Sequence, residues 1–178
     1  MANNKDLVST AKPKVTGAVS VAPLGSVLPT DATSELDTAF KSLGFVSEDG
    51  FTISTSSTSE NIKEWGGEVV NSSQTEKSES AKIKLIEALN AEVLKFVYGS
   101  SNVTAEGKNI TVTATGEELP ACIFVVDILM KNDAVKRIVI DGAKPKLNGD
   151  VNYKTNEAVG YEVEIDCPKF HKEYITTK

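Results

Sequence analysis

Two long stretches of the chain have the polar and apolar spacing of β-strands and are joined by a pair of glycines. Residues 51–65 and 68–87 flank Gly66-Gly67, a favourable two-residue hairpin turn. The middle of both strands is rich in Ser and Thr, a composition normally typical of linkers. Because this tract lies between hydrophobic ends that need one another, the pattern predicts a long hairpin that projects from the body.

Further strands are predicted over much of the remaining chain. Val15, Val19 and Val21 indicate a strand that ends at Pro23, and residues 109–115 indicate a short one. Residues 121–131 and 134–141 flank Asn132-Asp133 as a second hairpin, followed by a loop over 142–160. The last strand, 161–168, alternates cleanly between a core face (Tyr161, Val163, Ile165 and Cys167) and an acidic face (Glu162, Glu164 and Asp166).

Two short helices are also predicted. In the first, Leu36, Phe40 and Leu43 recur at helical spacing after several cap residues, and Gly44 supplies the stop. The second runs from Leu89 to Tyr98, with Asn90 as its cap, Gly99 as its stop and an apolar face that includes Leu89. The elements together predict a mainly-β fold. It consists of one domain over residues 15–167, a flexible N-terminal arm over 1–14 and a C-terminal arm over 168–178.

The charge of the chain is unevenly distributed. Its 178 residues suit a single core, and its net charge is −6. Three lysines oppose one carboxylate in each arm, which leaves −10 for residues 15–167. An acidic body argues against gripping nucleic acid but allows DNA to pass nearby. The basic arms are either solvated tails or segments that dock on an acidic neighbour.

The sequence also bears on compartment and redox state. The N-terminus is polar and lacks the apolar core of a signal peptide. The longest apolar run, 121–130, is interrupted by Asp127 and is too short to span a membrane. We therefore expect synthesis in a cytoplasm, where Cys122 and Cys167 are more readily two buried thiols than a disulfide.

Candidate chemistry is sparse. The single histidine, His171, lies in the basic tail, and no Cys/His spacing or glycine-rich loop fits a metal or phosphate site. We therefore expect neither enzymatic activity nor a cofactor. Trp65, at the predicted hairpin tip, either packs on its own hairpin or anchors a neighbouring subunit.

Five segments, in order along the chain, carry a resemblance to a known family. They are TGAVSVAPLGSVLPTDA, LGFVSEDGF, IKEWGGEVV, QTEKSESAKIKLIEALNAEVLKFVYG and AVGYEVEIDCP. The set is similar to the tail tube (major tail) proteins of long-tailed, siphovirus-type bacteriophages. The resemblance implies a β-sandwich-like fold with a flanking helix, related to type VI secretion tube proteins. It also implies six-membered rings that stack into a hollow, non-contractile tube through which DNA is ejected.

Further expectations follow from the resemblance. The protein would reside in the virion tail after assembly in the host cytoplasm, with tape measure, tail terminator and baseplate proteins as partners. Contact candidates between subunits or rings are Lys5, Lys12, Lys14, Trp65, Gly66, Gly67, Lys169 and Lys172. Candidates for the lumen or an acidic face are Glu76, Glu79, Lys82, Asp127, Glu162, Glu164 and Asp166. The alternative is a phage or cell-surface β-sandwich that binds a ligand or mediates adhesion.

Overall fold

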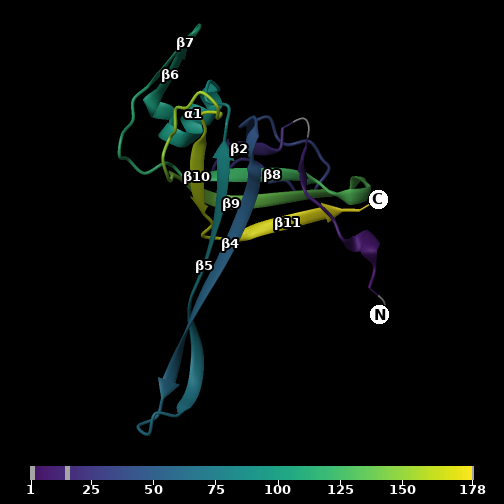
Figure 1. The fold of residues 1–178 in the computed structure, drawn as a ribbon, viewed down its shortest axis with the longest axis vertical. Helices are drawn as coiled ribbons and strands as arrows, with labels where there is room; N and C mark the ends of the chain where they lie inside the picture. The colour runs from purple at the N-terminus through teal and green to yellow at the C-terminus, as the bar shows by residue number, and fades with distance from the viewer. Residues whose placement is uncertain (1–2, 15–16, 178) are drawn as a thin grey trace.

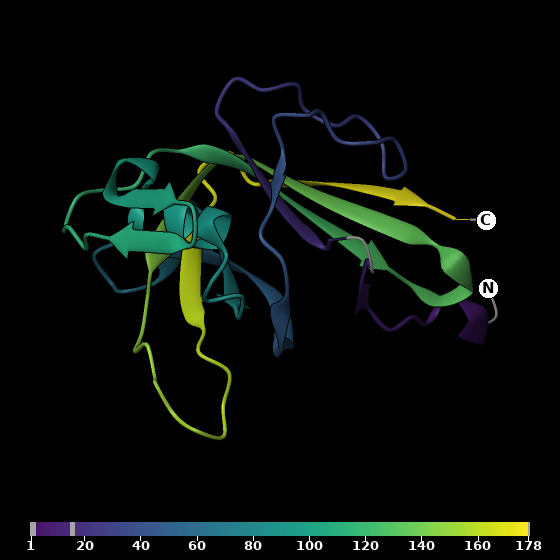
Figure 2. The ribbon, with the colours of Figure 1, turned by 90° about the horizontal axis from the view of Figure 1, so that it is seen from above.

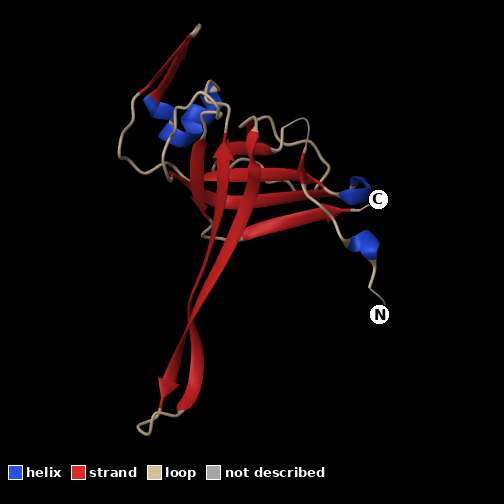
Figure 3. Ribbon diagram, viewed as in Figure 1, coloured by secondary structure: helices blue, strands red, loops and turns tan. Residues whose placement is uncertain are grey.

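Strands are the main secondary structure of the protein, a computed structural model that describes residues 3–14 and 17–177 (Figures 1 and 3). Val15 of the first predicted strand lies outside the described residues. The elements in chain order are η1 Lys5–Leu7, β1 Lys12–Pro13, β2 Val19–Pro23, β3 Lys41–Ser42, β4 Val46–Lys63, β5 Val69–Leu85, α1 Ala91–Tyr98, η2 Ser100–Asn102, β6 Val103–Glu106, β7 Asn109–Val112, β8 Cys122–Leu129, η3 Lys131–Asp133, β9 Val135–Leu147, β10 Tyr161–Asp166 and β11 His171–Thr176. The mainly-β prediction is confirmed.

Strand β9 belongs to two antiparallel sheets. Its first half pairs with β8 and β11, and β2, β3 and β1 extend that sheet beyond β8. Its second half pairs with β10, and β5 and β4 follow in order. In Figure 1 the strands of the first sheet run across those of the second. Gly142 marks the change of partner, because its φ of +80° is a conformation that side chains strain to adopt.

The main core lies between the two sheets and α1. Strand β8 is buried on both faces, which explains its nearly continuous apolar sequence. Phe124 on one face of β8 stacks with Phe51 and Phe96, at ring-centroid distances of 6.2 and 5.7 Å. These contacts tie the first sheet to the hairpin base and to α1, giving the predicted sandwich-like packing with a flanking helix.

Helix α1 ends at Tyr98, as the sequence predicts, but it begins at Ala91, two residues after the predicted start at Leu89. The Oδ1 of Asn90 accepts a hydrogen bond from the Glu92 N–H at 3.0 Å, which satisfies one of the unpaired donors at the helix start. Gly99, with a φ of +94°, ends the helix. Leu89 was expected on the apolar face, but it precedes the cap and is 89% exposed.

The helix predicted around Leu36–Leu43 is wrong, because residues 31–40 form turns and residues 41–42 form β3. The Asp31 carboxylate accepts hydrogen bonds from the backbone N–H groups of Thr33 and Ser34, and Asp37 accepts one from Ala39. Such local side-chain bonds compete with helical backbone bonds. Of the apolar residues at helical spacing, Leu36 and Phe40 instead cover the outer face of the first sheet, whereas Leu43 is buried in the main core.

That outer face holds a second, smaller cluster. Ala22, Ile123, Val125 and Val139 are buried there, and the segment 31–40 passes over them (Figure 2). Tyr174 of β11 packs against the same cluster.

Three further features differ from the sequence prediction. β9 continues to Leu147 through a stretch expected to be loop, and β6 was not predicted. Pro145 is tolerated because β9 has left β8 by this point, so its missing N–H falls on the open side of the strand. Residues 171–176 of the expected C-terminal arm form β11, which pairs with β9.

Candidate assembly surfaces

The β4–β5 hairpin is the largest exposed feature of the subunit. β5 pairs with β10 only as far as Ser80, and beyond this point no third strand of the described residues pairs with the hairpin. Its free part is about 40 Å long at the rise of an extended strand, and Figure 1 shows it projecting from the body. Every residue from 54 to 78 is exposed. Since an isolated two-stranded hairpin is at best marginally stable in water, this surface calls for a partner.

The tip of the hairpin is apolar, although the shaft is polar. Trp65 is fully exposed, so it does not pack on its own hairpin. Ile62, Val69 and Val70 beside it are about half-exposed or more. Large apolar side chains gathered at a protruding point are typical of an interaction surface.

The tip loop is one residue longer than the predicted Gly66-Gly67 turn. The Glu64 N–H donates to the Glu68 carbonyl and the Gly67 N–H donates to the Glu64 carbonyl, both at 2.9 Å. These bonds close a three-residue loop over 65–67, in which Gly67 adopts a φ of +92°. Hydrogen bonds from the backbone N–H groups of Gly66 and Glu68 lower the pKa of the Glu64 carboxyl.

Strand β4 is the outermost strand of the second sheet. Along its 18 residues it pairs only with β5, so its other edge presents backbone donors and acceptors in the described chain. An edge of this length is a template for pairing with another strand.

The lysines of the basic arms have different surroundings. Lys5 in η1 and Lys12 in β1 are exposed. Lys14 lies 3.4 Å from the Oδ2 of Asp127, and Lys169 lies 2.7 Å from the Oδ2 of Asp141. Lys172 places its ammonium 5.0 Å from the centre of the Tyr174 ring.

Two of the candidates for an acidic face are internal. Asp127 is 3% exposed and Glu79 is 7% exposed. The Oε1 of Glu79 accepts a hydrogen bond from the backbone N–H of His171 at 2.8 Å. The same oxygen lies 2.9 Å from the Nδ1 of the His171 ring. Both carboxylates therefore make contacts within the subunit instead of presenting charge at its surface.

The remaining candidates lie on the hairpin and on β10. Glu76 is exposed on the hairpin shaft and Glu162 is exposed on β10. Glu164 lies 3.9 Å from Lys82 of β5, and Asp166 pairs with Lys146 of β9. Lysines on both neighbouring strands thus offset the alternating carboxylates of β10.

Arg137 was not singled out from the sequence, yet it is the most buried charged side chain of the described residues, at 1% exposure. It donates to both carboxylate oxygens of Asp127, at 2.7 and 2.9 Å. Its remaining nitrogen donates to the carbonyls of Asp31 and Ser34, at 3.1 and 2.9 Å. The arginine therefore fixes the 31–34 turn to the first sheet. This ion pair could have been found from the predicted hairpin around Asn132-Asp133, because the register of that hairpin places Arg137 opposite Asp127.

Cys122 and Cys167 are both buried and are not joined in a disulfide. Burial raises the pKa of each thiol to about 12, and the nearby charges of Glu79 and Asp166 add to the effect at Cys167. The prediction of two buried thiols is confirmed.

Within residues 3–14 and 17–177, no cluster of three or more His, Cys, Asp or Glu side chains could hold a metal ion. None of the helices in this part of the chain has the length and apolar character of a membrane span.

Comparison with known proteins finds a family that matches nearly the whole chain. A family model described as phage tail tube protein matches residues 1–174. A search of curated proteins finds no significant match.

Proposed function

Because the chain belongs to the phage tail tube protein family, we propose that six copies form a ring and that the rings stack into a hollow, non-contractile tail tube. Family membership already makes the protein a structural subunit of the virion tail that assembles with itself into a tube. The proposal adds the ring number, the stacking and a siphovirus-type tail that ejects DNA into the host.

The projecting hairpin carries this proposal. Residues 54–78 are exposed throughout, and the outer edge of β4 is unpaired in the described subunit. A neighbouring copy that pairs with this edge removes the aggregation hazard of a long open strand. Repeating the same contact around an axis closes a ring, and a second contact that does not close generates a filament.

The charge of the body supports passage of DNA without binding. Residues 15–167 carry a net charge of −10, and a lumen lined by such a surface offers few cations to phosphates. Since the family is structural, we also propose that the protein is not an enzyme. Assembly in the host cytoplasm, an architecture related to type VI secretion tubes, and contacts with tape measure, tail terminator and baseplate proteins complete the proposal.

Negative-stain electron microscopy of the concentrated, pure protein tests the proposed function. We expect rings or hollow filaments of uniform width, with six-fold symmetry in end-on class averages. Strictly monomeric particles that bind a glycan would contradict it and favour the adhesion module.

A further inference from the structure

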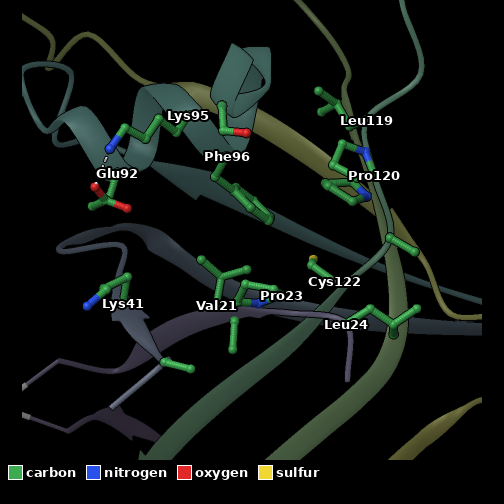
Figure 4. A pocket seen from close by; sticks show the side chains of 15 residues that line it. Val21, Pro23, Leu24, Lys41, Glu92, Lys95, Phe96, Leu119, Pro120 and Cys122 are labelled. Atoms are coloured by element: carbon green, nitrogen blue, oxygen red, sulfur yellow. Dashed lines mark hydrogen bonds and ion pairs between the residues drawn. The ribbon is translucent and has the colours of Figure 1, made fainter. Parts of the chain in front are cut away.

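An apolar groove lies between α1 and the edge of the first sheet (Figure 4). Its volume is about 550 Å³. Phe96 of α1 forms one wall, Val21 and Pro23 of β2 form the other, and Leu119 and Pro120 close one end. Leu24 at its margin is 54% exposed, so the groove opens to solvent.

The rim of the groove carries more positive than negative charge. Lys41 and Lys95 line it together with a single carboxylate, Glu92. Lys95 lies 2.8 Å from Glu92, which leaves the charge of Lys41 unmatched by any carboxylate lining the groove.

The hairpin tip has the complementary chemistry. Its apolar side chains are Ile62, Trp65, Val69 and Val70, and Trp65 alone offers roughly 150–250 Å² for burial. Segment 60–70 carries three glutamates against one lysine, so the tip is acidic where the groove rim is basic. Opposite charge around an apolar centre fits the usual anatomy of an interface, with a tryptophan anchor and a polar rim.

We propose that the groove receives the hairpin tip of a second copy of this chain, with Trp65 seated against Phe96. This inference rests on the proposed function and names the acceptor surface for one of its contacts. In Figure 1 the hairpin tip lies at one end of the long axis, and α1 and β2 lie in the body, toward the other end. The tip of a copy therefore cannot reach its own groove.

The separation of the two surfaces determines the kind of assembly. Donor and acceptor are different patches, one at the hairpin tip and one in the body, so the contact is heterologous and each copy can bind one copy on either side. A contact of this kind that repeats by translation along the long axis forms an open stack and not a closed ring. It is therefore suited to stacking one ring on the next.

Disulfide trapping tests the contact directly. Glu68→Cys subunits, which keep the Trp65 anchor, are mixed with Ala121→Cys subunits, both in a Cys122→Ala background because Cys122 lines the groove. We expect a disulfide-linked dimer of the two variants on a non-reducing gel after mild oxidation. Thr176→Cys, on exposed β11 away from the groove, is the matched control and should not be linked. No dimer with Ala121→Cys, or equal linkage to both positions, would overturn the proposal.

A steric block provides an independent test. Ala121→Trp fills the groove and should reduce sedimentable tube by about tenfold or more. Ala105→Trp adds the same bulk on exposed β6 and should leave assembly unchanged. Equal monomer melting temperatures in the two variants attribute the loss to the contact and not to misfolding. Normal tubes from Ala121→Trp would overturn the docking.

The outcomes separate this inference from the proposed function. Wild-type protein that forms no tubes would contradict the proposed function, whereas trapping in concentrated subunits still tests the docking. Tubes that form normally while Val8→Cys, in the exposed N-terminal segment, links to Ala121→Cys would show that the arm occupies the groove and would overturn the docking alone.

Discussion

Arg137 and Asp127 form a buried ion pair in which every guanidinium nitrogen has a partner. Isolated charges are expensive to bury, so the geometry of the partners decides whether the pair is tolerated. Here the carboxylate is held at two points, and the third nitrogen of the arginine holds two backbone carbonyls. Removing one partner is therefore more disruptive than replacing both.

Arg137→Met should lower the free energy of unfolding by about 3–5 kcal/mol, because it leaves the buried Asp127 with Lys14, at 3.4 Å, as its one cationic partner among the described residues. Chemical denaturation followed by circular dichroism measures the change. Lys136→Met is the matched control, since its pair with Glu173 lies nearer the surface, with side chains 23% and 34% exposed, and should be worth about 1 kcal/mol or less. Combining Arg137→Met with Asp127→Leu should recover most of the lost free energy of unfolding. A double variant no more stable than the single one would show that packing, and not the unpaired charge, dominates.

The two thiols should be almost unreactive in the folded subunit. Burial raises both pKa values to about 12, so at pH 8 the folded protein holds almost no nucleophilic thiolate. A colorimetric disulfide reagent at pH 8 should therefore modify the native protein slowly and the urea-unfolded protein rapidly, with two thiols per chain. Rapid modification of the native protein would indicate that the groove lined by Cys122 opens frequently.

Sequence patterns predicted correctly those elements whose ends are determined by neighbouring residues. The hairpin around Gly66-Gly67 and the capped helix α1 could be predicted because neighbouring residues determine both. The helix around Leu36–Leu43 was wrong because apolar spacing outweighed the turn-forming Asp31 and Asp37. At those two residues, side-chain hydrogen bonds to the backbone decide the local structure.

Features that depend on distant pairing could not be predicted. The sharing of β9 between two sheets follows from the bend at Gly142 and from where β8 ends, which no local pattern states. The strand character of residues 171–176 arises only because β9 offers them an edge. The groove between α1 and β2 likewise brings together segments far apart in the sequence.

Strand β11 should contribute strongly to the stability of the subunit. It pairs with β9 over six residues, places Tyr174 on the second cluster and supplies His171 to the buried Glu79. Deleting residues 171–178 should lower the free energy of unfolding by several kcal/mol, since Glu79 is left buried without its main partner. Thermal melting of the monomer measures the effect, and removal of the last two residues alone is the control. Equal melting temperatures would show that β11 forms only weakly.

The hairpin tip should behave in the opposite way. Trp65→Ala should leave the melting temperature of the monomer unchanged, because the side chain is fully exposed and buries nothing in the subunit. The same variant should require a protein concentration about tenfold higher, or more, to assemble, since interface tryptophans commonly dominate binding energy. Light scattering against concentration measures assembly, with Thr58→Ala on the polar shaft as the control. A large loss of monomer stability would contradict the assignment of Trp65 to an interface.

At the scale of the whole molecule, acidic, basic and apolar surfaces lie in different parts of the chain. The body is acidic, the first fourteen residues carry a net charge of +2, and the longest exposed element ends in an apolar tip. The N-terminal segment is attached to its own subunit through a short strand and through side-chain contacts that include the Lys14–Asp127 pair. β1 makes two residue pairs with β8, and the Oγ of Ser9 accepts the Lys131 N–H at 2.7 Å. Leu7 and Val8 are 81% and 72% exposed, so this segment has apolar surface available for contact with a neighbouring subunit.

Deleting residues 1–12 should therefore leave a folded subunit that stacks poorly. The deletion removes one short strand pairing and no residue of either buried cluster, so the melting temperature of the monomer should change little. Assembly should require a higher protein concentration, because a basic arm can no longer dock on an acidic neighbour. Thermal melting of the monomer measures the first effect, and light scattering at low and high salt measures the second.

Lys5→Gln with Lys12→Gln is the control that keeps the length of the arm and removes the charges of its two exposed lysines. If charge drives the docking, this variant should reproduce the loss and its assembly should become insensitive to salt. If it assembles normally while the deletion does not, the exposed Leu7 and Val8 carry the contact. Truncated protein that polymerises as readily as the full chain would contradict docking by this arm altogether.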